Sequence, residues 1–165
     1  MKIELILSLA NICSNPSIEL AKTMTASNEI QTWSATIAEH LSVDLTIGDE
    51  DFDSYDDGES KNNQKVTWEF HNALLRTTIV WNCVHADEQL DSFIRQLETD
   101  PDAEKPTSFD IEDCNGYLGV TLARCRLTFE RSKYGNGTGD GLIRVSVPFD
   151  ESLVPLFKAI QRVCR

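Results

Sequence analysis

The chain has 165 residues, of which 41% are hydrophobic, and its formal net charge is −12. This length and apolar content are enough for one domain with its own core but not for two. The acidic balance excludes a phosphate-binding surface as the main function and disfavours attachment to anionic lipid. It suits a basic protein as partner, although acidity also serves solubility without any partner.

Cysteine usage and the N-terminal segment predict a cytoplasmic protein. Glu4 interrupts what would be the apolar part of a signal peptide. Every apolar run in the sequence is far shorter than the length of about 18 residues that a membrane span needs. The cysteines are odd in number and widely scattered, which indicates buried thiols in a reducing compartment rather than a disulfide framework. They also lack the paired spacing of a structural zinc site: Cys13, Cys83, Cys114, Cys125 and Cys164.

Residues 1–42 are expected to form a helical N-terminal part of the domain. Residues 3–13 fit either a strand or a helical face, and we favour the helix because helical patterns follow. Asn15 and Pro16 are typical of a helix start, and that helix extends to about Met24. A third helix, from residue 27 to about residue 41, is predicted from one apolar stripe: Ile30, Trp33, Ile37, Ala38 and Leu41.

A short strand over residues 43–47 leads into an acidic mobile loop over residues 49–64. Seven carboxylates lie between Asp49 and Glu59, and like charges at this density disfavour compact structure. A calcium loop does not fit, because neither possible register offers both the glycine at position six and the bidentate glutamate at position twelve.

The central stretch predicts a strand pair and a helix. Val66, Trp68 and Phe70 alternate with polar residues, which is typical of a strand with one buried face. After a turn at residues 71–73, residues 74–84 are rich in β-branched and aromatic side chains and return as a second strand. A helix over residues 87–98 then follows from apolar residues at helical spacing: Leu90, Phe93, Ile94 and Leu97.

The next stretch predicts further strands after a proline-containing linker over residues 99–108. Residues 109–112 alternate as a strand. From residue 117 to residue 131 the apolar pattern changes parity near Ala123 and Arg124, which predicts a β-bulge or a sharp bend there.

A strand over residues 142–149 leads into the last helix, which starts near residues 152–154 because Pro155 lacks the amide proton that a helix interior needs. The order of elements predicts the α+β class, with a mostly antiparallel sheet and helices packed on one of its faces. We expect a single domain over residues 1–165, with residues 65–165 as its sheet-and-helix core.

No catalytic signature is present, and no cofactor or metal is predicted. His40, His71 and His85 lie in no recognisable nucleophile context. The glycine-rich segment 133–141 lacks the lysine and serine of a phosphate-binding loop.

The one basic feature of interest consists of Arg124, Arg126 and Arg144. They would form a small cationic patch if they shared the solvent face of a sheet. We favour the alternative, in which they pair across strands with carboxylates: Glu69, Glu130 or Asp110.

From residue 65 onwards, a helix of the type LDSFIRQL follows a strand pair, and a closing strand runs into F-x-x-x-x-L-x-x-F. Phe149 and Phe157 match the ends of the second pattern, whereas Val154 stands where its leucine is expected. This order resembles small bacterial immunity proteins that neutralise tRNase-type wall-associated and contact-dependent toxins. The resemblance implies a non-enzymatic inhibitor of one cognate toxin, and no binding residues carry over from it.

The composition leads separately to a similar function, because an acidic domain without a catalytic pattern could cover the active site of a basic nuclease. Loop carboxylates would mimic phosphates, and two aromatic side chains would anchor the contact, without direct binding to nucleic acid. The predicted partner-binding residues are those of the acidic loop: Asp49, Glu50, Asp51, Phe52, Asp53, Tyr55, Asp56, Asp57 and Glu59.

Two other functions fit the same sequence. A phage-type inhibitor of a host defence nuclease would have the same chemistry as an immunity protein. A small ligand-binding or enzymatic domain would instead assemble its site from dispersed residues, for which His71, His85, Arg124 and Arg126 are the candidates. The oligomeric state stays open.

Overall fold

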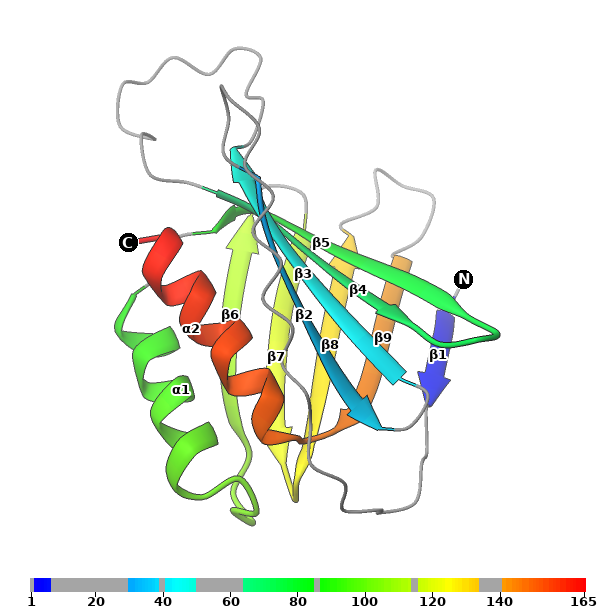
Figure 1. The fold of residues 1–165 in the computed structure, drawn as a ribbon. Helices are drawn as coiled ribbons and strands as arrows, with labels where there is room; N and C mark the ends of the chain where they lie inside the picture. Colours follow the sequence, from blue (N-terminus) through cyan, green and yellow to red (C-terminus); the bar gives the residue numbers. More distant parts are fainter. Residues whose placement is uncertain are drawn as a thin grey trace.

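The computed structural model describes residues 2–6, 30–38, 41–49, 64–84, 87–113, 116–133 and 141–165. Within these residues the chain forms two β-sheets and two α-helices, which confirms the α+β class. One sheet has five strands in the order β1-β9-β8-β7-β6, and the other has four in the order β2-β3-β4-β5. Figure 1 shows the four-stranded sheet crossing in front of the five-stranded sheet, with the helices beside it. The prediction of a single sheet is therefore wrong.

The four-stranded sheet is antiparallel throughout and contains the expected central strand pair. Its inner positions are apolar and buried, and they alternate with polar positions on the outer face, as the period of two requires. The predicted second strand starts later than expected, because Leu74 lies in the turn and is 95% exposed. The strands are β2 Gln31–Ala38, β3 Leu41–Asp49, β4 Gln64–His71 and β5 Arg76–Val84.

The predicted helical N-terminal part is wrong wherever the structure describes it. Trp33, Ala35 and Ile37 are buried in alternation with Ser34 and Thr36, so residues 31–38 form strand β2 rather than a helix. Trp33 and Ile37 fit both periods, and pairing with β3 decides between them.

Residues 2–6 likewise form a strand, β1 (Lys2–Ile6), which pairs in parallel with β9. The expected helix from residue 15 to residue 24 lies outside the described residues.

The five-stranded sheet is antiparallel except for the pairing of β1 with β9. Its strands confirm the expected strands near residues 109–112 and 142–149. The additional bounds are β6 Thr107–Asp113, β7 Gly116–Ala123, β8 Arg126–Lys133 and β9 Gly141–Pro148.

The sharp bend predicted near residue 124 is a reversal of the chain between β7 and β8. Arg124 and Cys125 have φ angles of 49° and 54°, so both adopt the left-handed conformation of a two-residue hairpin turn. The Cys125 amide donates to the Pro101 carbonyl at 3.1 Å, and its carbonyl accepts from the Phe149 amide at 2.8 Å. These bonds fix the turn to the segments on either side of it.

Both predicted helices in the second half of the chain are confirmed. Helix α1 spans Glu88–Thr99, and the Asp87 carboxylate caps it by accepting from two backbone amides. Helix α2 spans Val154–Val163 after a single 3₁₀ turn, η1 (Glu151–Leu153), and Pro155 lies in its first turn, where no amide is needed.

The helices pack on one face of the five-stranded sheet, the face that the four-stranded sheet also covers. Phe93 of α1 lies 6.4 Å from Phe109 of β6, measured between ring centroids. Phe157 of α2 lies 5.1 Å from Trp68 of the four-stranded sheet and 6.2 Å from Phe129 of the five-stranded sheet. Helix α2 therefore joins the two sheets, and the polar outer face of each sheet is left towards solvent.

Candidate functional site

The predicted partner-binding loop lies almost entirely outside the described residues. Asp49 is the last residue of β3, and the other eight predicted contact residues, from Glu50 to Glu59, belong to the segment between β3 and β4 that the structure does not describe. The role of this loop stays a prediction.

The structure gives each of the three arginines a different environment. Arg144 forms an ion pair with Glu130, whose Oε2 lies 2.7 Å from Nη2 and 2.8 Å from Nε, so cross-strand pairing is confirmed for this residue. Arg126 donates to the Ser146 hydroxyl at 3.3 Å. Arg124 lies in the β7–β8 turn and is exposed.

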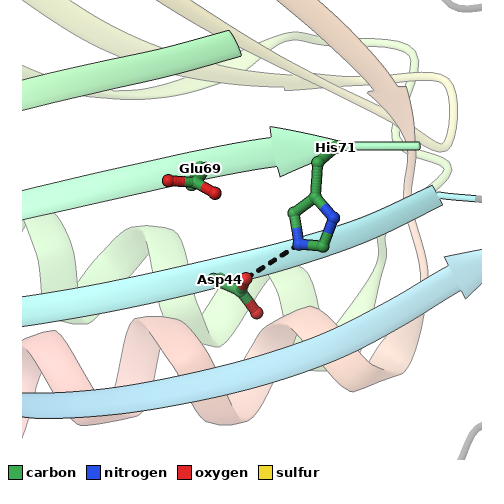
Figure 2. Close-up of side chains that lie close together, drawn as sticks. All are labelled: Asp44, Glu69 and His71. Atoms are coloured by element: carbon green, nitrogen blue, oxygen red, sulfur yellow. Dashed lines mark hydrogen bonds and ion pairs between the residues drawn. The ribbon is translucent and has the colours of Figure 1, made fainter. Parts of the chain in front are cut away.

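His71 belongs to a cluster that the sequence did not reveal. On the outer face of the four-stranded sheet, Asp44, Glu69 and His71 bring one possible ligand atom each to within 4.8 Å of one another. Nε2 of His71 is 2.8 Å from Oδ2 of Asp44. Figure 2 shows the three side chains on the side of the sheet that faces away from the helices.

Strand register brings these residues together. Asp44 lies directly opposite Glu69, and His71 lies opposite Ser42, two positions further along β4. Residues directly opposite and diagonal to one another on one face are neighbours within reach of long side chains. Both strands are interior strands of the sheet, so their backbones are held on both sides.

The cluster is half-buried and partly neutralised. The side chains of Asp44, Glu69 and His71 are 29%, 28% and 32% exposed. Arg76 of β5 donates from Nε to Oε1 of Glu69 at 2.6 Å, while its own side chain is 70% exposed. Zinc accepts an imidazole nitrogen and carboxylate oxygens as ligands. A histidine that is hydrogen-bonded to an aspartate can also act as a general base, because the aspartate orients the imidazole ring.

The ligand-binding or enzymatic alternative requires dispersed histidines and arginines to meet at one site, and the described ones do not. His71 lies on the four-stranded sheet, whereas Arg126 lies on the five-stranded sheet and Arg124 in a turn at its end. His85 falls outside the described residues.

A second charged feature is the acidic edge, defined as residues 87–113: helix α1, the loop after it, and β6, the last strand of its sheet. This segment holds ten carboxylate side chains and two basic ones. The acidity of this segment is visible in the sequence. It was not predicted as a binding surface because residues 49–59 form a shorter and denser acidic run.

Within the acidic edge, some carboxylates are paired with residues of helix α2 and of the C-terminal segment after it. Asp91 accepts from Gln161 and Arg165, and these two contacts lower the pKa of its carboxyl group, the bond from Gln161 most of all. Glu98 accepts from Lys158.

The part of the acidic edge that follows helix α1 carries carboxylates without such ion pairs. Asp100, Asp102 and Glu104 are exposed, and no ion pair joins them to a described basic residue. They follow the C-terminus of α1, whose last turn contains no basic residue and which itself carries partial negative charge. Burial first, and then Asp102, raises the pKa of the nearby Cys125 thiol.

No protein-family model, curated protein or solved structure matches this chain. Among the described residues, neither helix is long and apolar enough to cross a membrane.

Proposed function

We propose that this chain is a non-enzymatic acidic inhibitor that binds one cognate basic protein, and that it acts in the cytoplasm as an immunity protein against a nuclease toxin. The observation that carries this proposal is the acidic edge. The segment holds ten carboxylates and two basic side chains, and Asp100, Asp102 and Glu104 within it are exposed without an ion pair to a described basic residue.

Electrostatics explains why such an edge suits a basic partner. A nuclease carries positive charge where it holds phosphates, and a patch of opposite sign accelerates encounter and selects the partner. The backbone that carries Asp100, Asp102 and Glu104 is already fixed by the capped end of α1 and by the hydrogen bond from the Cys125 amide to the Pro101 carbonyl. Binding through them would therefore cost little ordering of the backbone.

The predicted loop contacts at residues 49–59 belong to the same proposal, in which they would supply further carboxylates for a basic partner. A phage-type inhibitor of a host defence nuclease would bind in the same way. The genes that surround this one distinguish the two, because a toxin gene lies beside an immunity gene.

The test is affinity capture from nuclease-treated host lysate at low and moderate salt, with mass spectrometry of what is retained. The wild type should capture one basic protein in stoichiometric amount, and less of it at moderate salt, because exposed charges are screened. Asp100→Asn with Glu104→Gln should weaken the capture, as should neutralisation of Asp51, Asp53 and Asp56.

A matched control removes the same charge elsewhere. Glu151→Gln deletes one exposed carboxylate in η1, outside the acidic edge, and is compared with Glu104→Gln alone. Equal loss of capture in these two single variants would show that only net charge matters, and retention of no basic protein by the wild type would refute the proposal.

A further inference from the structure

We propose that Asp44, Glu69 and His71 form a zinc-binding site on the outer face of the four-stranded sheet. This site is separate from the acidic surfaces and does not depend on the proposed inhibitor function. It is missed by sequence patterns because its ligands come from two strands that residues 50–63 separate in the sequence.

The distances are close to those that zinc requires. Zinc bonds to imidazole nitrogen and carboxylate oxygen are about 2.0–2.2 Å long, so ligand atoms around a tetrahedral ion lie about 3.3–3.6 Å apart. Nε2 of His71 and Oδ2 of Asp44 are 2.8 Å apart, and all three ligand atoms lie within 4.8 Å of one another. Side-chain rotations that move the ligand atoms by about an ångström would make room for the ion. The bonds from His71 and Asp44 to zinc would then replace the hydrogen bond between these two residues.

The backbone beneath the site is fixed. Residues 42–49 pair with residues 64–71 in unbroken register. The residues that alternate with the three ligands point inwards and are almost completely buried: Val43, Leu45, Trp68 and Phe70. A site on such strands is preorganised, so zinc binding would not have to order the chain.

The donor set selects the class of metal. Calcium and magnesium prefer oxygen ligands alone, and copper(I) prefers thiolate or thioether sulfur. Zinc accepts both imidazole nitrogen and carboxylate oxygen, and a site with three protein ligands leaves the fourth position to water. Each ligand side chain is about 30% exposed, so water has access to that position.

Arg76 opposes a cation at this site, and its geometry makes a specific prediction. Its guanidinium contacts Glu69 at 2.6 Å, so zinc must displace it. Because the Arg76 side chain is 70% exposed, it can move into water. Arg76→Gln should therefore bind zinc several-fold more tightly than the wild type.

The experiment is titration of the metal-free full chain with zinc chloride by calorimetry, together with NMR of the histidine ring signals. The wild type should bind one zinc with a shift of the His71 ring signals. His71→Ala, Asp44→Asn and Glu69→Gln should each lose about tenfold or more in affinity. Circular dichroism verifies that each variant is folded.

Glu130→Gln is the matched control for Glu69→Gln. Both glutamates are 28% exposed and both pair with an arginine across strands, but Glu130 lies on the other sheet. The Glu130→Gln variant should bind zinc with the same affinity as the wild type.

Three results would overturn the proposal. The first is no zinc binding by the wild type, and the second is unchanged binding in His71→Ala, which would place the ion elsewhere in the chain. The third is equal or weaker binding in Arg76→Gln.

Discussion

Replacing Phe157 by alanine should destabilise the whole domain, because this side chain joins the helices to both sheets. Its ring is fully buried and lies 5.4 Å from Phe93, 5.1 Å from Trp68 and 6.2 Å from Phe129, measured between centroids. A buried aromatic side chain removes about 200 Å² from water, worth about 5 kcal/mol at about 25 cal/mol per Å². Alanine retains part of this, so we expect a loss of about 3–5 kcal/mol.

Urea unfolding followed by tryptophan fluorescence measures this loss, since Trp68 is in contact with the ring. Leu74→Ala is the control, because Leu74 is 95% exposed in the β4–β5 turn and should change the free energy of unfolding by no more than about 0.5 kcal/mol. A loss below about 1.5 kcal/mol for Phe157→Ala, or separate transitions for the two sheets, would refute this account of the core.

Three further predictions concern the turn, an ion pair and a thiol. Arg124→Asn with Cys125→Gly should raise the free energy of unfolding by about 1–2 kcal/mol in urea, because both positions have positive φ; a loss would contradict the turn. The pKa of Asp91 lies below its ordinary value of 3.8, so its stabilising effect is present above that pH and is lost as pH falls through the lower folded pKa. The difference in urea midpoint between about pH 6 and about pH 3 should therefore be smaller in Asp91→Asn than in the wild type. Burial raises the pKa of Cys164 to about 12, so iodoacetamide followed by mass spectrometry should modify it only after unfolding, and labelling in the folded state would contradict its burial.

The sequence predicts those elements whose apolar spacing has a single interpretation. Helix α1 follows from Leu90, Phe93, Ile94 and Leu97, all of which are buried. Helix α2 follows in the same way from apolar residues at helical spacing, Leu156, Phe157 and Ile160, and from Pro155 at its start.

Segment 31–38 was predicted wrongly because its apolar spacing fits two structures. Trp33 and Ile37, four residues apart, satisfy the periods of both a helix and a strand, and only pairing with β3 makes the segment a strand. The β7–β8 turn was predicted only as a bulge or bend, because Arg124 and Cys125 are not the Asn-Gly type that signals a two-residue hairpin.

The cluster of Asp44, Glu69 and His71 could not be derived because it depends on register. The sequence places each residue on the polar parity of a predicted strand, but it does not say which residue of β3 lies opposite which residue of β4. Residues 50–63 separate these strands in the sequence, which is too many for hairpin-turn geometry to set the register.

The most direct test of the inhibitor function is a titration of the captured basic partner's nuclease activity with this chain. Tight binding over the partner's active site predicts activity that falls linearly and is lost at a ratio of one to one, with a weaker effect of the Asp100→Asn and Glu104→Gln double variant. Full nuclease activity in the presence of excess chain, with binding verified in the same sample, would contradict the proposal that this protein is a nuclease inhibitor.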